Sequence, residues 1–60
     1  MTTKSELRRM ARGYWTQAGK IGFVHKPKLA ERGQRLADKA WQIHNLMCEL
    51  ARDLEELADK

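Results

Sequence analysis

The 60-residue sequence is poor in the residues that cross-link small proteins. It contains a single cysteine, Cys48, so the chain cannot form an internal disulfide, and a reducing compartment is the expected environment. A chain this short buries little surface and is marginally stable alone. Small folds of this kind usually need disulfides, a bound metal or self-association. Because metal ligands are also scarce, self-association is the expected remedy.

The sequence also lacks long apolar runs. No segment approaches the roughly 20 consecutive apolar residues that a membrane-spanning helix requires. Residues 1–12 carry several charges but no apolar core of the kind found in a secretory signal peptide. These absences predict a cytoplasmic protein that does not enter the membrane.

Helix-breaking residues are few, which leaves long stretches free to be helical. Thr3 followed by Glu6 forms a capping box, and the apolar residues from Leu7 onward follow helical spacing. Gly19 is a typical helix stop, so we expect a first helix over about residues 4–18.

The single proline suggests where a second helix begins. Pro27 suits the first turn of a helix, and after it only Gly33 interrupts the helix-forming sequence. We therefore predict a connector at residues 19–27 and a long helix over about residues 28–58. The expected fold is all-α: a single helical-hairpin domain over residues 1–60.

The predicted long helix carries two apolar rows. One follows a heptad pattern, which is typical of helices that pair as in a coiled coil. A neighbouring row of mostly small residues would allow another helix to approach closely, and the first helix is expected to pack there. The heptad row contains Leu29, Leu36, Ile43, Leu50 and Leu57 with Gly33, Ala40, Met47 and Leu54; the neighbouring row contains Ala30, Ala37, Trp41, His44, Cys48, Ala51 and Ala58.

The predicted helix lengths favour a dimer. A first helix of half the length would leave four large side chains of the second helix uncovered, and each contributes about 1.5–3 kcal/mol when buried. An antiparallel pair would also place the basic start of one long helix beside the acidic end of the other. We predict an antiparallel homodimeric four-helix assembly, in which the first helix could pack on its own chain or on its partner. The predicted dimer interface is Leu36, Ala40, Ile43, Met47, Leu50, Leu54 and Leu57.

Basic residues concentrate in the first part of the chain. The formal net charge is +4, but the segment up to Arg35 carries nine basic and two acidic residues, a net of +7. Clustered positive charge is typical of phosphate binding, so nucleic acid is the favoured partner, with an acidic protein surface as the other possibility. The alternative function is a small regulator that binds and inhibits another protein through an apolar and basic surface. The predicted contact residues are Arg8, Arg9, Arg12, Trp15, Lys20, Phe23, Lys26 and Lys28.

Residues for catalysis or for a cofactor are not apparent. His44 and Cys48 are four residues apart and share a helix face, so two copies in an antiparallel dimer could in principle hold a tetrahedral zinc ion. A match of two residues arises easily by chance, so a packing role at the middle of the interface is expected instead. His25 has no carboxylate or nucleophile nearby in the sequence to form a catalytic pair. We therefore expect a non-enzymatic, regulatory binding protein without a metal or cofactor, in which Tyr14 and Trp41 belong to the core.

Overall fold

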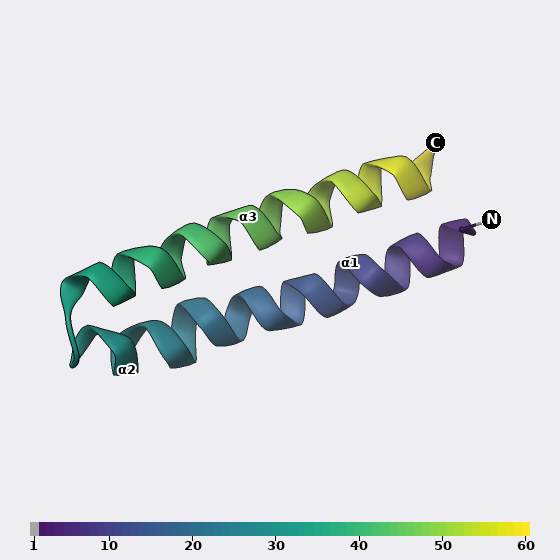
Figure 1. The fold of residues 1–60 in the computed structure, drawn as a ribbon. Coiled ribbons are helices and arrows are strands. Elements are labelled where there is room, and N and C mark those ends of the chain that lie inside the picture. The colour runs from purple at the N-terminus through teal and green to yellow at the C-terminus, as the bar shows by residue number, and fades with distance from the viewer. Residues whose placement is uncertain (1) are drawn as a thin grey trace.

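A computed structural model describes residues 2–60 and shows two antiparallel helical arms joined by a short turn (Figure 1). The first arm consists of α1 (Lys4–Gly19), a π-helical segment η1 (Lys20–His25) and α2 (Lys26–Ala30). The second arm is α3 (Gln34–Asp59). Throughout residues 2–60 all regular secondary structure is helical, which confirms the predicted all-α hairpin.

The first arm begins where the capping box predicted. Thr3 has extended backbone geometry and caps α1, and its side-chain oxygen accepts a hydrogen bond from the backbone N–H of Glu6 at 3.1 Å. This bond satisfies one of the backbone donors that every helix leaves free at its start.

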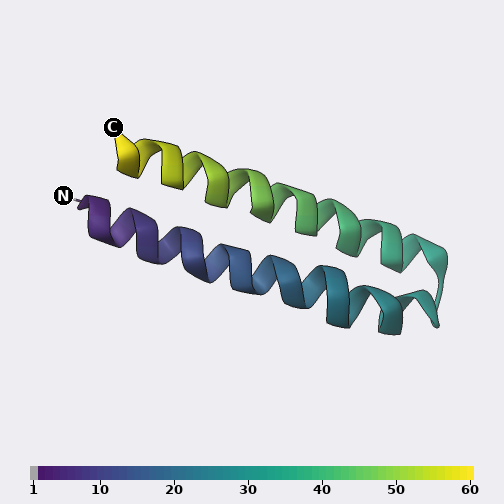
Figure 2. The same cartoon turned by 180° about the vertical axis from the view of Figure 1, so that it is seen from behind.

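The predicted connector at residues 19–27 is wrong, because these residues are helical. Gly19, Lys20 and Lys26 all have right-handed helical backbone angles, and the ribbon runs without a break from α1 to α2 (Figures 1 and 2). The glycines at positions 19 and 22 therefore do not end the helix. Instead the helix widens into one π segment, in which the N–H of Lys26 donates to the carbonyl of Ile21, five residues back.

Pro27 explains why the wide turn lies where it does. The proline has no N–H to donate, and its ring crowds the carbonyl four residues before it in a regular α-helix. In the structure Pro27 lies in the first turn of α2, directly after the π segment. Pro27 lies at a helix start, as the sequence predicted, but that start lies within a continuous arm.

The turn between the arms falls at Gly33, which the sequence analysis placed inside the long helix. Gly33 has φ of +155° and ψ of 142°, a conformation that favours glycine because it lacks a Cβ atom. Its N–H donates to the carbonyls of Leu29 and Ala30, and its own carbonyl accepts from the N–H groups of Leu36 and Ala37. One residue therefore ends the first arm and starts α3.

The two arms meet along a seam of small side chains. Ala37, Ala51 and Ala58 are buried against the first arm, so the first helix packs on the predicted small-residue row of its own chain. The central cluster combines Ala11 of α1 with Ala51 and Leu54 of α3. Six of the seven buried apolar residues among residues 2–60 are alanines, and Leu54 is the largest of them.

Gly22 leaves room for the His44 side chain between the two arms. A Cβ atom at this position would lie 2.7 Å from Nδ1 of His44. The His44 ring occupies that space and donates from Nδ1 to the backbone carbonyl of Ala18 at 2.6 Å. The His44 ring of α3 thus joins the two arms: it packs over Gly22 of the π segment and bonds to Ala18 of α1.

The predicted difference in length between the two helices is absent from the structure. The first arm runs from Lys4 to Ala30 and matches α3 in length, so no part of α3 extends beyond it. Leu54 is buried within the hairpin and Met47 is half-buried. Large apolar side chains are nevertheless exposed, because they lie beside the small-residue seam rather than in it.

We predict that Gly22→Ala destabilises the hairpin and that Gly13→Ala stabilises it. The methyl group at position 22 would collide with the His44 ring, and overpacking of this kind costs about 1–3 kcal/mol. A Cβ atom at Gly13, in the middle of α1, meets nothing within 4 Å, so this control should gain about 0.5–1 kcal/mol in helix propensity. Thermal unfolding followed by circular dichroism measures both; equal stabilities of the two variants would contradict the packing at Gly22.

Candidate nucleic-acid interface

The folded chain separates into two halves of different charge. We define the turn half as residues 20–46 and the open half as residues 2–19 with 47–60. The turn half contains six basic and two acidic side chains, a net of +4, whereas the open half contains six of each and is neutral. The entire net charge of the protein, +4, is therefore accounted for by the turn half. Its charged residues are Lys20, Lys26, Lys28, Arg32, Arg35 and Lys39, with Glu31 and Asp38.

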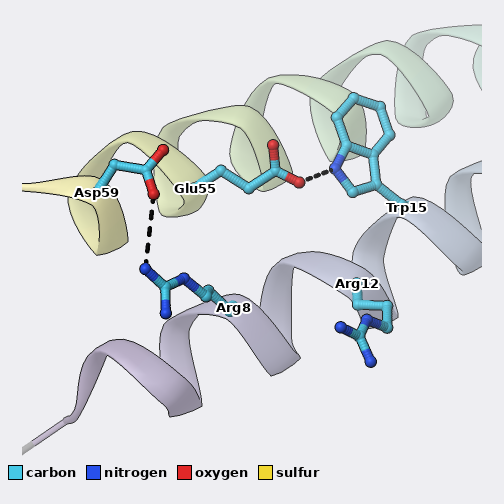
Figure 3. Close-up of a pocket in the computed structure, with 5 residues that line it drawn as sticks. All are labelled: Arg8, Arg12, Trp15, Glu55 and Asp59. Carbon is cyan, nitrogen blue, oxygen red and sulfur yellow. Dashed lines mark hydrogen bonds and ion pairs between the residues drawn. The ribbon is translucent and has the colours of Figure 1, made fainter.

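The basic residues near the N-terminus are instead balanced by acidic neighbours on α3. Nη2 of Arg8 lies 3.7 Å from Oδ1 of Asp59. A hollow of about 330 Å³ at this place is lined by Arg8, Arg12, Trp15, Glu55 and Asp59 (Figure 3). Arg12 points away from Glu55 and Asp59 in this view. The hollow holds two cationic and two anionic side chains, which makes it a poor site for phosphate.

Arg9 lies outside this balanced group but close to it. It lines a shallow hollow of about 250 Å³ together with Ser5, Arg8 and Arg12 on the exposed side of α1. The structure thus brings together three of the predicted contact residues, Arg8, Arg9 and Arg12. It brings them together within the neutral half of the hairpin.

Trp15 is not free to stack on a partner. Its indole Nε1 donates to Oε1 of Glu55 at 2.6 Å, and the side chain is 37% exposed. This hydrogen bond connects the two arms and fixes the ring beside a carboxylate (Figure 3). An anionic ligand would meet Glu55 before it met the indole ring.

A cluster of aromatic rings lies in the turn half. Trp41 stacks on His44 with ring centroids 4.7 Å apart, and Nζ of Lys26 lies 4.7 Å from the centroid of Trp41. Phe23 contacts His44 edge to face at 6.1 Å. Trp41 is 43% exposed, so the expectation that it belongs to the core is wrong, whereas Tyr14 is half-buried against the central cluster.

Phe23 is the most exposed large apolar side chain among residues 2–60, at 77%. Lys20 and Lys28 are also exposed, whereas Lys26 is half-buried because its chain lies over Trp41. Four predicted contacts thus lie in the charged half of the molecule. Arg32, Arg35 and Lys39 belong to the same half but were missed, because their place beside the lysines depends on a turn at Gly33, which the sequence did not predict.

His44 and Cys48 lie side by side at the contact between the two arms. The Nδ1 atom of His44 donates to a carbonyl, so Nε2 is the acceptor in the neutral ring, and Sγ of Cys48 lies 3.7 Å from it. Among residues 2–60 no third histidine, cysteine or carboxylate joins them to form a group able to hold a metal ion.

The predicted dimer interface divides between two faces of α3. Ala40 and Leu54 are buried against the first arm, and Met47 is half-buried. The remaining predicted positions stay exposed, together with Leu46, which flanks them on α3. These exposed side chains are Leu36, Ile43, Leu46, Leu50 and Leu57.

Comparison with models of known protein families, with curated proteins and with solved structures gives no match for this chain. Within residues 2–60, none of the helices combines the length and the apolar character needed to cross a membrane.

Proposed function

We propose that this chain is a small, non-enzymatic regulatory protein that binds nucleic acid through the turn half of its hairpin. The observation that supports this proposal is the uneven distribution of charge. The net charge is +4 over residues 20–46 and zero over the rest of the chain. Phosphate groups are attracted to clustered basic side chains with little regard to sequence. The proposed contacts are Lys20, Lys26, Lys28, Arg32 and Arg35, with Phe23 as an exposed aromatic neighbour.

The length of the hairpin supports a binding site at one end. The molecule measures 42 Å along its longest axis. Charges in water at 0.1 M salt are largely screened beyond about 10 Å, so the acidic residues of α3 near Asp59 do not weaken the field around the turn. Arg8, by contrast, lies 3.7 Å from Asp59, and Arg12 lines the same hollow as Glu55 and Asp59. The proposed site is therefore shifted from the N-terminal arginines to the turn.

The proposal includes self-association into an antiparallel homodimeric four-helix assembly. The hairpin buries mostly alanine, which removes little apolar surface from water, and it leaves large apolar side chains of α3 exposed. Contiguous exposed apolar side chains on a soluble protein mark an interaction site. If the chain remains monomeric, the same side chains favour the alternative function, a regulator that binds and inhibits another protein.

We predict that removing charge from the turn half weakens nucleic-acid binding, whereas removing it from the open half does not. The test variant is Lys28→Gln/Arg32→Gln/Arg35→Gln, and the matched control is Arg9→Gln/Arg12→Gln/Arg52→Gln, which loses the same charge from exposed positions. Fluorescence anisotropy with a labelled DNA duplex over about 50–200 mM salt gives the slope of log affinity against log salt concentration. The magnitude of this negative slope decreases by about 0.9 for each lost phosphate contact. The turn variant should lower this magnitude by about 2–3 and the control by less than about 1.

A larger loss in the control than in the turn variant would return the binding site to the N-terminal arginines. Absence of binding by the unmodified protein at about 50 mM salt, to duplex and to single-stranded DNA and RNA alike, would contradict nucleic-acid binding. The positive charge would then serve a negatively charged protein partner.

A further inference from the structure

One side of α3 carries an uncovered apolar row. Leu36, Ile43, Leu50 and Leu57 recur every seven residues and therefore lie above one another along the helix. They are 44%, 46%, 42% and 54% exposed although the first arm runs alongside them over its whole length. Among residues 2–60 no other segment packs over this row.

The contacts on the other side of the hairpin show which way this row faces. Trp15 and Glu55 join the arms on one side, and Glu55 precedes Leu57 by two residues, which is about 200° around an α-helix. The apolar row therefore lies on the side of α3 away from the hollow that Trp15 and Glu55 line. Met10 of α1 is two residues after Arg8, so it faces the same side, and it is 45% exposed.

A second row lies just outside the first and has a different composition. Lys39, Leu46 and Asp53 also recur every seven residues, each three residues after a member of the inner row. All three are exposed, and Leu46 is 64% exposed. The outer row thus has a positive charge at one end, an apolar centre and a negative charge at the other end.

The two rows are nearly symmetrical about their centre. Leu36 and Leu57 are equally far from the point between residues 46 and 47, and so are Ile43 and Leu50. A two-fold axis at this point would place each side chain of the inner row against another member of the same row. The charges of the outer row choose the direction, because antiparallel helices bring Lys39 beside Asp53 of the partner subunit, whereas parallel helices bring like charges together.

We infer that this side of α3 is the face through which two copies associate. The contact is antiparallel and centred near Leu46, with Leu36 against Leu57 of the partner subunit and Lys39 paired with Asp53 of the partner subunit. It takes the dimer as proposed above and assigns its face, register and ion pairs. The interface predicted from the sequence is thereby revised: Ala40 and Leu54 belong to the hairpin, and Leu46 belongs to the dimer.

A charge exchange tests the register. Lys39→Asp and Asp53→Lys each replace two attractive pairs in the dimer by two repulsive pairs, so each should raise the dimer dissociation constant by about tenfold or more. The double variant Lys39→Asp/Asp53→Lys restores both pairs and should return the constant to within about threefold of the unmodified protein. Sedimentation equilibrium distinguishes the dimer from the single chain of 7.0 kDa and gives these dissociation constants.

A disulfide experiment tests the direction without relying on affinity. In a Cys48→Ser background, chains with Leu36→Cys are mixed with chains carrying Leu57→Cys under oxidising conditions. An antiparallel contact should give mainly the mixed disulfide, whereas a parallel contact should give the two symmetrical ones. The control pairs Leu36→Cys with Val24→Cys, which is equally exposed but lies on the first arm, and should give no preferred product.

Several results would overturn the inference. A monomer at micromolar concentration in sedimentation would remove the second copy and leave the face for another protein. A dimer whose double variant stays weak, or which forms the symmetrical disulfides, would disprove the antiparallel register. Nucleic-acid binding is measured separately by the turn variant, so a protein that dimerises without binding nucleic acid would contradict only the proposed function.

Discussion

The close contact between the arms, made by alanine and glycine, determines most of what else the molecule can do. Ala11 and Ala18 on the first arm and Ala37, Ala51 and Ala58 on α3 are almost completely buried. Small side chains let two helices approach closely, but they remove little apolar surface from water. The larger side chains consequently lie on the flanks of the seam, where a second molecule can reach them.

The π segment is explained by the same close packing of the two arms. Along the first arm the inward positions Ala11, Tyr14 and Ala18 follow α-helical spacing, and the next positions inward are Gly22 and Lys26. From Tyr14 to Lys26 these positions make three consecutive steps of four residues, which is one residue more than the usual alternation of three and four. A turn of π-helix absorbs one extra residue, so the inward face stays aligned with α3 after Pro27.

That alignment has a consequence for the surface. Gly22 takes the inward position and receives the His44 ring, and Phe23 is therefore turned outward. The exposed ring beside Trp41 and Lys26 follows from the packing of its neighbour. Its exposure is a product of the seam, which supplies the turn half with an aromatic surface next to its positive charge.

The sequence was sufficient to predict the helices, their antiparallel arrangement and the alanine row at which they meet. These features depend on capping at Thr3 and on the periodicity of residues such as Ala37, Ala51 and Ala58, which are local properties of the chain. The turn could not be predicted, because glycine and proline signals at residues 19–27 were stronger than the single Gly33. Only packing distinguishes Gly22, which admits a ring, from Gly33, which needs positive φ.

The candidate site changed for the same reason. Lys20, Lys26 and Lys28 were predicted from the clustering of basic residues in the sequence, which made Arg8 and Arg12 look equally suitable. The fold places Asp59 beside Arg8, and Arg12 lines the same hollow as Glu55 and Asp59. Charge balance between distant segments depends on which residues face each other, and that depends on the position of the turn. A shift of the turn by several residues was therefore enough to move the expected binding surface from one end of the hairpin to the other.

The charge of the turn half and the direction of the proposed dimer constrain each other. Two turn halves side by side would concentrate +8 at one end and would repel each other, since each carries +4. An antiparallel pair places each turn half beside the neutral open half of its partner and separates the two charged ends along a rod of which one hairpin spans 42 Å. That length corresponds to about 12 base pairs at roughly 3.4 Å each. The proposed antiparallel dimer would therefore also present two of the proposed phosphate-binding ends, spaced so that one duplex, or two separate strands, could contact both.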